Sequence, residues 1–260
     1  MNQAISQQQG QTRLPRGRHG LPREAVETSQ RQRIHAGMIQ VVAEHGYAEC
    51  RIVDVIDIAG VSRKTFYELF DDKEHCYLST YDLILGQLLS VTSAEFEAAP
   101  DAKWSDRIRT GLAAMIDVIV AEPLAARFCI VEVLAAGPKA LARRDAAIRQ
   151  FTYFLDAGRS ETSIELPGIT SLAIAGGINE LLCSELIHGA SANLPARLPD
   201  MVFWITSPFL GPAGAALQRD LARQMIEERS RQGMTVESRQ AAVESRRVAI
   251  EPHRTSVEPL

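Results

Sequence analysis

Four consecutive polar residues, Ser62-Arg63-Lys64-Thr65, bring two hydroxyl groups, a guanidinium and an ammonium to one point in the chain. These groups can bond to the base edges that line the major groove of DNA, where arginine and lysine pair best with guanine. Phe66 and Phe70 follow at the spacing of one helical face. The pattern predicts a helix that begins after Ser62 and is anchored on its inner side by the two phenylalanines.

A second short helix is predicted just before this one. It ends at Ala59-Gly60, and Ser62 is a suitable N-cap residue for the helix that follows. Two helices joined by a short turn that contains glycine form a helix-turn-helix, although two short core helices with a glycine between them give the same pattern. The apolar face predicted for the helix before the turn consists of Val53, Val55, Ile56 and Ile58.

The segment from about residue 31 to residue 76 resembles the DNA-binding domain of TetR-family transcriptional regulators. The resemblance rests on the order and spacing of Gly46-Tyr47, Ala59-Gly60-Val61-Ser62, Thr65-Phe66-Tyr67, Phe70 and Lys73-Glu74. It implies an all-α protein, with an N-terminal three-helix helix-turn-helix DNA-binding domain followed by a larger helical ligand-binding and dimerisation domain. The chain departs from the usual family residues at Cys50, Arg51, Ile56 and Lys64, so the operator sequence cannot be taken from a relative.

Seven residues are the expected DNA contacts. Arg63 or Lys64 is the better candidate for a guanine edge, while phosphate contacts would set the register of the protein on the duplex. Arg51, Tyr67 and Lys73 are expected to make those phosphate contacts, with helix packing as the alternative role of Tyr67. The full set is Arg51, Ser62, Arg63, Lys64, Thr65, Tyr67 and Lys73.

The N-terminal residues 1–22 are rich in Gln, then in Arg, Gly and Pro, with too little apolar surface to fold alone. Arg13, Arg16 and Arg18 either belong to a disordered tail or form a basic arm that reaches phosphates or the minor groove. The net charge of −4 does not exclude nucleic acid, because residues 1–33 carry six arginines against two glutamates.

The remaining pattern predicts helices and no strands. A scaffold helix runs from Pro22 to Gly46, and a long helix begins after Asp71-Asp72 and stops before Pro100. Further helices are expected over 104–120, 124–135, 141–155, 169–189, 196–210 and 213–232. The expected domains are a disordered basic arm (1–22), a DNA-binding domain (23–75), an effector-binding and dimerisation domain (76–212), and a charged C-terminal helix with a disordered tail (213–260).

The segments 169–189 and 196–210 are apolar on more than one face, which a single core does not require. This favours a homodimer in which the two segments meet their copies in a four-helix bundle, as the resemblance also implies. A dimer would present two recognition helices to the half-sites of a palindromic operator, about 34 Å or a multiple of that apart.

The resemblance further implies a small-molecule effector that binds in the helical body and releases a repressor from DNA. The effector is unknown, and no cofactor is expected. Each candidate for the pocket has an ordinary core or surface role as its alternative. The candidates are Trp104, Met115, Phe128, Glu132, Phe151, Phe154, Asn179 and Leu182.

Other classes of protein find less support in the sequence. The four cysteines lie far apart without metal-ligand spacing, so we expect reduced thiols and no bound metal. No phosphate-binding loop or catalytic motif is present, which argues against an enzyme and leaves a helical protein-interaction adaptor as the rival to a DNA-binding regulator. The chain has neither an apolar N-terminal signal nor a membrane-length apolar run, so we expect a cytoplasmic protein.

Overall fold

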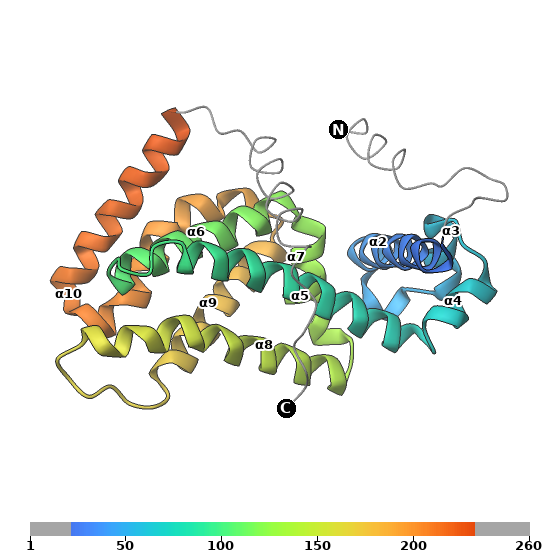
Figure 1. Ribbon diagram of the computed structural model, residues 1–260, viewed down its shortest axis with the longest axis horizontal. Coiled ribbons are helices and arrows are strands. Elements are labelled where there is room, and N and C mark those ends of the chain that lie inside the picture. The colour runs from blue at the N-terminus through green and yellow to red at the C-terminus, as the bar shows by residue number, and fades with distance from the viewer. Residues whose placement is uncertain (1–21, 232–260) are drawn as a thin grey trace. The chain divides into compact units, whose positions relative to one another are not determined.

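The computed structural model describes residues 22–231, and every regular element in this range is helical (Figure 1). The predicted basic arm and C-terminal tail fall on residues 1–21 and 232–260, which lie outside the described residues. The chain divides into two compact units between Thr80 and Tyr81, inside helix α5 (Lys73–Glu97). The all-α fold predicted from the sequence is confirmed.

Unit 1 contains α2 (Arg23–Glu49), α3 (Ile52–Ala59), α4 (Arg63–Leu69) and the first turns of α5. The apolar face of α2 is buried and packs on α3. The two helices approach most closely at Gly37, where a Cβ atom would lie 2.8 Å from the carbonyl oxygen of Val55. The buried residues of this face include Ile34, Met38, Val41 and Val42.

The apolar face of α3 differs from the prediction. Val53 and Ile58 are 48% and 41% exposed, so neither belongs to the core. The buried residues are Val55, Ile56 and Ala59. Each residue turns a helix by about 100°, so Val55, Ile56 and Ala59 lie within about 100° of one another, and Val53 and Ile58 lie at the two edges of this buried face.

The interior between α2, α4 and α5 is aromatic. Phe66 and Phe70 are almost completely buried, with ring centroids 5.6 Å apart. His35 packs edge-on against Phe70 at 5.4 Å. Burial, assisted by the charge of Arg31, lowers the pKa of His35 from 6.5 to about 4, so this buried ring is neutral near pH 7.

Unit 2 consists of the rest of α5 and the helices that follow it. α6 packs on α10, and both α7 and α8 pack on α9. The elements are α6 (Trp104–Ala121), α7 (Pro123–Ile130), η1 (Glu132–Ala135), α8 (Pro138–Asp156), η2 (Ala157–Glu161), α9 (Thr170–Ile187), η3 (Ser191–Asn193) and α10 (Leu194–Arg231), where η marks a short 3-10 helix.

One of these helices differs from the prediction, and the break predicted between 196–210 and 213–232 is found inside α10. α7 ends at Ile130 and is followed by η1 (Glu132–Ala135), instead of running on as one helix. α10 bends at Gly211, whose φ of 70° suits glycine, and continues through Pro212 to Arg231. Pro212 is tolerated because a residue at the first turn after a bend needs no N–H for a helical hydrogen bond.

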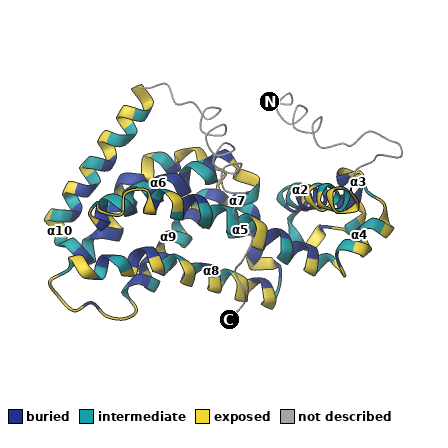
Figure 2. Cartoon of the chain, in the orientation of Figure 1, coloured by how far each residue is buried: buried dark blue, intermediate teal, exposed yellow. Residues whose placement is uncertain are grey.

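The core of unit 2 contains Trp104, and Figure 2 shows buried residues on the sides of the helices that face one another. The indole N–H of Trp104 donates to the carbonyl of Phe154 at 2.7 Å, and its ring lies 4.6 Å from that of Phe209. A Cβ atom at Gly158 would come within 2.6 Å of the indole, so only glycine fits there. Trp104 therefore joins α6, α8 and α10.

Polar contacts fasten the part of α10 beyond Gly211 to α6. The buried amide of Gln218 donates to the hydroxyl of Ser105 at 3.0 Å and accepts from the guanidinium of Arg109. Further along, Arg229 pairs with Asp117 at 3.0 Å. These buried or half-buried partners fix the register of the two helices.

Candidate DNA interface

The turn between α3 and α4 has the geometry of a glycine helix cap. Gly60 has φ 61° and ψ 41°, a left-handed conformation that glycine adopts without steric cost. Its N–H donates to the carbonyl of Asp57 at 3.3 Å, and the N–H of Val61 donates to that of Ile56 at 3.2 Å. The last carbonyls of α3 are thereby satisfied, and the chain is turned into α4 with a defined angle.

Arg33 on α2 also holds this turn, a role that the sequence analysis does not identify. Its guanidinium donates to the carbonyl of Ala59 at 2.8 Å and to that of Gly60 at 3.2 Å. The partners are 26 and 27 residues away, so no local pattern could have indicated the contact.

The first residues of α4 lie together at the surface. The side chain of Ser62 accepts a hydrogen bond from the N–H of Thr65 at 3.0 Å, which confirms the predicted N-cap. Ser62, Arg63 and Lys64 are exposed and Thr65 is half-buried, while Phe66 anchors the inner side. The structure thus presents these four polar side chains, and the exposed Tyr67 one turn later, from one short helix.

Arg51, a predicted phosphate contact, pairs with a carboxylate of its own domain. Its guanidinium donates to both carboxylate oxygens of Asp54, at 2.8 and 2.7 Å, a bidentate arrangement. The pair lowers the pKa of Asp54. A phosphate at Arg51 would have to compete with Asp54, a partner that the spacing of three residues could have indicated.

Lys73, the other predicted phosphate contact on a helix end, is half-buried inside unit 1. Its ammonium donates to the carbonyls of Tyr47 at 3.0 Å and Cys50 at 3.1 Å, and lies 4.4 Å from the centre of the Tyr47 ring. Lys73 therefore joins the start of α5 to the end of α2, and one N–H of the ammonium is left for an outside partner.

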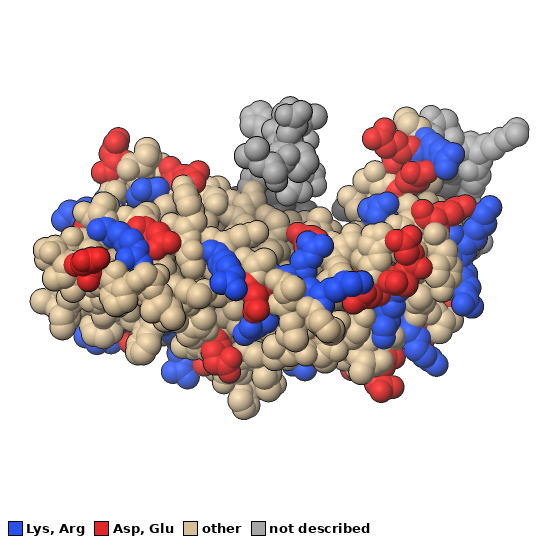
Figure 3. All heavy atoms as spheres, turned by 90° about the horizontal axis from the view of Figure 1, so that it is seen from below, with Lys and Arg blue, Asp and Glu red and all other residues tan. Residues whose placement is uncertain are grey.

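Unit 1 is acidic overall. Residues 22–80 hold seven Lys and Arg against ten Asp and Glu, and Figure 3 shows basic and acidic side chains interspersed on the face that it draws. Arg23 pairs with Glu27 at 2.8 Å, but Arg63 makes no ion pair with any described residue. The positive charge of unit 1 is therefore confined to single side chains. Among these, Arg63 has the fewest polar partners within the described residues.

The cysteines of unit 1 are buried thiols. Burial raises the pKa of Cys50 to about 11 and that of Cys76 to about 12, which keeps both protonated and poorly reactive near pH 7. Within residues 22–231, no cluster of three His, Cys, Asp or Glu side chains could hold a metal ion. In the same range, no helix is long and apolar enough to cross a membrane.

The residues predicted to line an effector pocket are mostly packed in the interior of unit 2. Phe128 is fully buried, and Phe151 packs against the main core cluster. Four more of the predicted pocket residues belong to that cluster: Trp104, Met115, Phe154 and Leu182.

The two polar candidates behave differently from each other. Glu132 is 8% exposed, and its carboxylate lies 3.1 Å from the guanidinium of Arg127, which also donates to the carbonyl of Leu186 at 3.3 Å. The side-chain N–H₂ group of Asn179 is buried and has no hydrogen-bond partner among the described residues. Asn179 is thus the candidate with a donor to spare.

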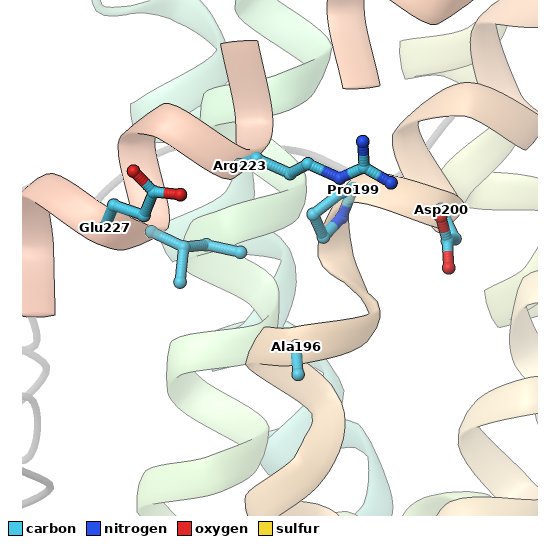
Figure 4. A pocket seen from close by; sticks show the side chains of 6 residues that line it. Ala196, Pro199, Asp200, Arg223 and Glu227 are labelled. Carbon is cyan, nitrogen blue, oxygen red and sulfur yellow. The ribbon is translucent and has the colours of Figure 1, made fainter. Parts of the chain in front are cut away.

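A hollow of about 240 Å³ lies elsewhere, between the two parts of α10. Figure 4 shows Arg223 extending past Pro199 in the direction of Asp200, with Glu227 on the far side of Arg223. The remaining residues that line the hollow are Ala196 and Ile226. None of the eight predicted effector residues lines this hollow.

Comparison with known proteins identifies the fold. No protein-family model and no curated protein matches the chain. Among solved structures, the fatty acid degradation regulator FadR from Bacillus halodurans superposes with a TM-score of 0.61 at 16% identity, covering 68% of this chain and 94% of its own. FadR from Bacillus subtilis, solved with stearoyl-CoA, gives 0.59 at 17% identity over 68% and 97%.

A TetR-family transcription regulator from Marinobacter aquaeolei VT8 gives a TM-score of 0.54 at 17% identity, over 76% of this chain and 96% of its own. The chain therefore has the fold of TetR-family transcription regulators. Because nearly the whole length of each neighbour is matched, the likeness extends beyond the helix-turn-helix to the helical body.

Proposed function

We propose that this protein is a DNA-binding transcription regulator of the TetR type, which binds a palindromic operator as a homodimer and is released by a small-molecule effector. The observation that carries the proposal is the α3–turn–α4 unit, whose inner side is held by Phe66 while Ser62, Arg63 and Lys64 stay exposed. Exposed donors at the start of a second short helix are what direct contact with base edges requires.

Selection of bound DNA from a random pool by the full-length protein tests the proposal. We expect enrichment of a two-fold symmetric site with half-sites about one helical turn, or a multiple of it, apart. The matched control is the double variant Arg63→Ala/Lys64→Ala, which leaves Phe66 and the turn in place and should enrich nothing. Failure of the wild-type protein to enrich any site would favour the protein-interaction adaptor instead.

The N-terminal arm has a specific part in this proposal. Residues 22–80 have an excess of three acidic groups, whereas residues 1–21 contain Arg13, Arg16 and Arg18 and no Asp or Glu. We therefore assign phosphate neutralisation largely to these three arginines. Replacing all three by Gln should reduce the slope of log affinity against log salt by about three per subunit.

Dimerisation is proposed to use α9 and the part of α10 before Gly211. Trp204 on α10 is 62% exposed, and a Cβ atom at Gly177 on α9 would lie 3.9 Å from its indole nitrogen. Ile187 at the end of α9 is 53% exposed. A large exposed aromatic beside a glycine is an arrangement that a second copy can cover.

The effector is proposed to enter the body near Asn179, where a buried donor lacks a partner. The buried residues of α9 near Asn179 include Ala175, Ile178 and Leu182, which favours a ligand with an apolar body and an acceptor group. Regulation then follows if the effector prefers a conformer that does not match the operator spacing. A complete switch needs about 5.5 kcal/mol of difference in effector affinity between the two conformers. Helix α5, which continues from unit 1 into unit 2, is the covalent connection through which a change in the body reaches unit 1.

A further inference from the structure

Two side-chain pairs lie side by side on the outer face of α4, each joining residues four apart. The guanidinium carbon of Arg63 lies 5.7 Å from the centre of the Tyr67 ring. The ammonium of Lys64 lies 3.6 Å from a carboxylate oxygen of Glu68. The two neighbouring cations therefore have different partners, an aromatic ring in one case and a carboxylate in the other.

The ring beneath Arg63 is itself held in place. Tyr67 packs edge-on against Phe66, with centroids 5.4 Å apart and ring planes at 85°. Phe66 is completely buried, whereas Tyr67 is 45% exposed. The phenol ring thus offers Arg63 a face whose direction is fixed from the core.

The two partners have opposite consequences for DNA contact. An aromatic ring attracts the flat face of a guanidinium. The N–H groups at the edge of the Arg63 guanidinium therefore stay available for a guanine. A carboxylate, in contrast, attracts the ammonium of Lys64 and repels phosphates. Arg63 also has no carboxylate partner among the described residues, so it is the cation prepared for an outside acceptor.

We propose that Tyr67 is a positioning residue that orients Arg63 toward a guanine edge, and that Lys64, held beside Glu68, adds positive charge without contacting a base. Arg63, rather than Lys64, then sets the sequence preference, and the ring of Tyr67, rather than its hydroxyl, is what contributes. The inference rests on the proposed function and decides between two cations that the sequence leaves equivalent. Pre-orientation matters because an arginine side chain loses rotamer freedom when it binds.

The test uses the full-length protein and the site that the wild-type protein selects. The measured quantity is the ratio of affinities for that site and for random duplex at one salt concentration. Tyr67→Leu should lower the ratio about threefold to fivefold, the range expected for an exposed cation–π contact. Tyr67→Phe should leave it unchanged. Arg63→Ala should lower it on the order of tenfold to a hundredfold.

The double variant Arg63→Ala/Tyr67→Leu should lose no more than Arg63→Ala alone, because Tyr67 acts through Arg63. Glu68→Gln, at an exposed position, should strengthen binding to the selected site and to random DNA by similar factors and leave the ratio unchanged. This variant keeps the test decisive if Tyr67→Leu proves unstable.

Three outcomes overturn the inference. In the first, Tyr67→Phe loses as much as Tyr67→Leu, which would assign the effect to the hydroxyl. In the second, Tyr67→Leu weakens both DNAs equally. In the third, Glu68→Gln changes the ratio, which would mean that Lys64 contacts a base. A wild-type protein that selects no site at all contradicts the proposed function itself, and the inference with it.

Discussion

The Nδ1 atom of His35 lies 2.8 Å from the hydroxyl oxygen of Thr80, and that hydroxyl donates to the carbonyl of Cys76 at 2.7 Å. Since the hydroxyl hydrogen is directed at Cys76, the ring nitrogen must be the donor to Thr80. Because burial lowers the pKa of His35 to about 4, the ring is neutral near pH 7 and carries its hydrogen on Nδ1. A buried, uncharged histidine therefore connects α2 to α5 inside unit 1.

The stability of unit 1 should consequently depend on pH. The unfolded chain binds a proton on His35 near pH 6.5, whereas the folded unit does so only near pH 4. Between these values the unfolded state holds more protons, so the free energy of unfolding falls as pH is lowered from 6.5 through 4. The full effect is about 3 kcal/mol. Hydrogen exchange of the α2 amides in the full-length protein, from pH 7.5 to 4.5, measures it.

Two variants separate His35 from the acidic groups that titrate in the same range. His35→Leu should remove most of the decline below pH 6.5, at the cost of the hydrogen bond to Thr80. His45→Gln, at an exposed position near the end of α2, should keep it. An unchanged pH profile in His35→Leu would assign the decline to other groups.

Lys73→Met should destabilise unit 1, whether or not Lys73 contributes to DNA binding. The substitution keeps the length of the side chain but removes its hydrogen bonds to the carbonyls of Tyr47 and Cys50. We expect a loss of about 2 kcal/mol, because hydrogen bonds from a charged donor to half-buried carbonyls are involved. Urea unfolding measures it, with Lys64→Met, at a side chain that is 85% exposed, as the control that should change little.

The salt dependence of DNA binding by Lys73→Met decides its second role. If Lys73 also neutralises a phosphate, the slope should fall by about one, under conditions where the variant is folded. An unaltered slope together with lowered stability would leave Lys73 a structural residue alone.

The parts of the fold that could be predicted from the sequence are those that depend on neighbours along the chain. The buried face of α2 and the Ser62 cap follow from helical periodicity and from one hydrogen bond over three residues. Arg33 and Lys73 hold carbonyls 23 to 27 residues away. Such contacts exist only after the helices pack, so basic residues of this kind look in the sequence like DNA contacts.

The effector site shows a second limit. Apolar residues that fill a core and apolar residues that line a cavity have the same composition and the same helical spacing. Trp104 and Phe154 illustrate this, because they contact each other through a hydrogen bond in a packed interior. The unpaired donor of Asn179 could be singled out only after its surroundings were known.

Gly37→Ala should destabilise unit 1, although alanine is the better helix former by about 1 kcal/mol. The added Cβ would lie 2.8 Å from the carbonyl oxygen of Val55 on α3, and backbone cannot move aside as a flexible side chain can. We expect a net loss of about 1–3 kcal/mol, measured by urea unfolding. Gly176→Ala, in α9 with nothing within 4 Å of the new atom, is the matched control and should not destabilise the fold of the subunit. A Gly37→Ala protein as stable as the wild type would mean that α2 and α3 are farther apart.

Trp204→Glu should weaken self-association. The side chain is 62% exposed on the part of α10 that we assign to the dimer, and two-fold symmetry introduces the change twice. Loss of a central tryptophan from an interface typically costs about 2 kcal/mol or more, and the glutamate adds a charge that must be desolvated. Sedimentation at micromolar concentration should show the dimer dissociation constant rise by at least about tenfold.

Leu217→Glu is the control: Leu217 is equally exposed, at 59%, but lies beyond Gly211, so the same charge there should leave association unchanged. Equal weakening by both variants would place the interface elsewhere, and a monomeric wild-type protein would remove the basis for two recognition helices acting on one operator.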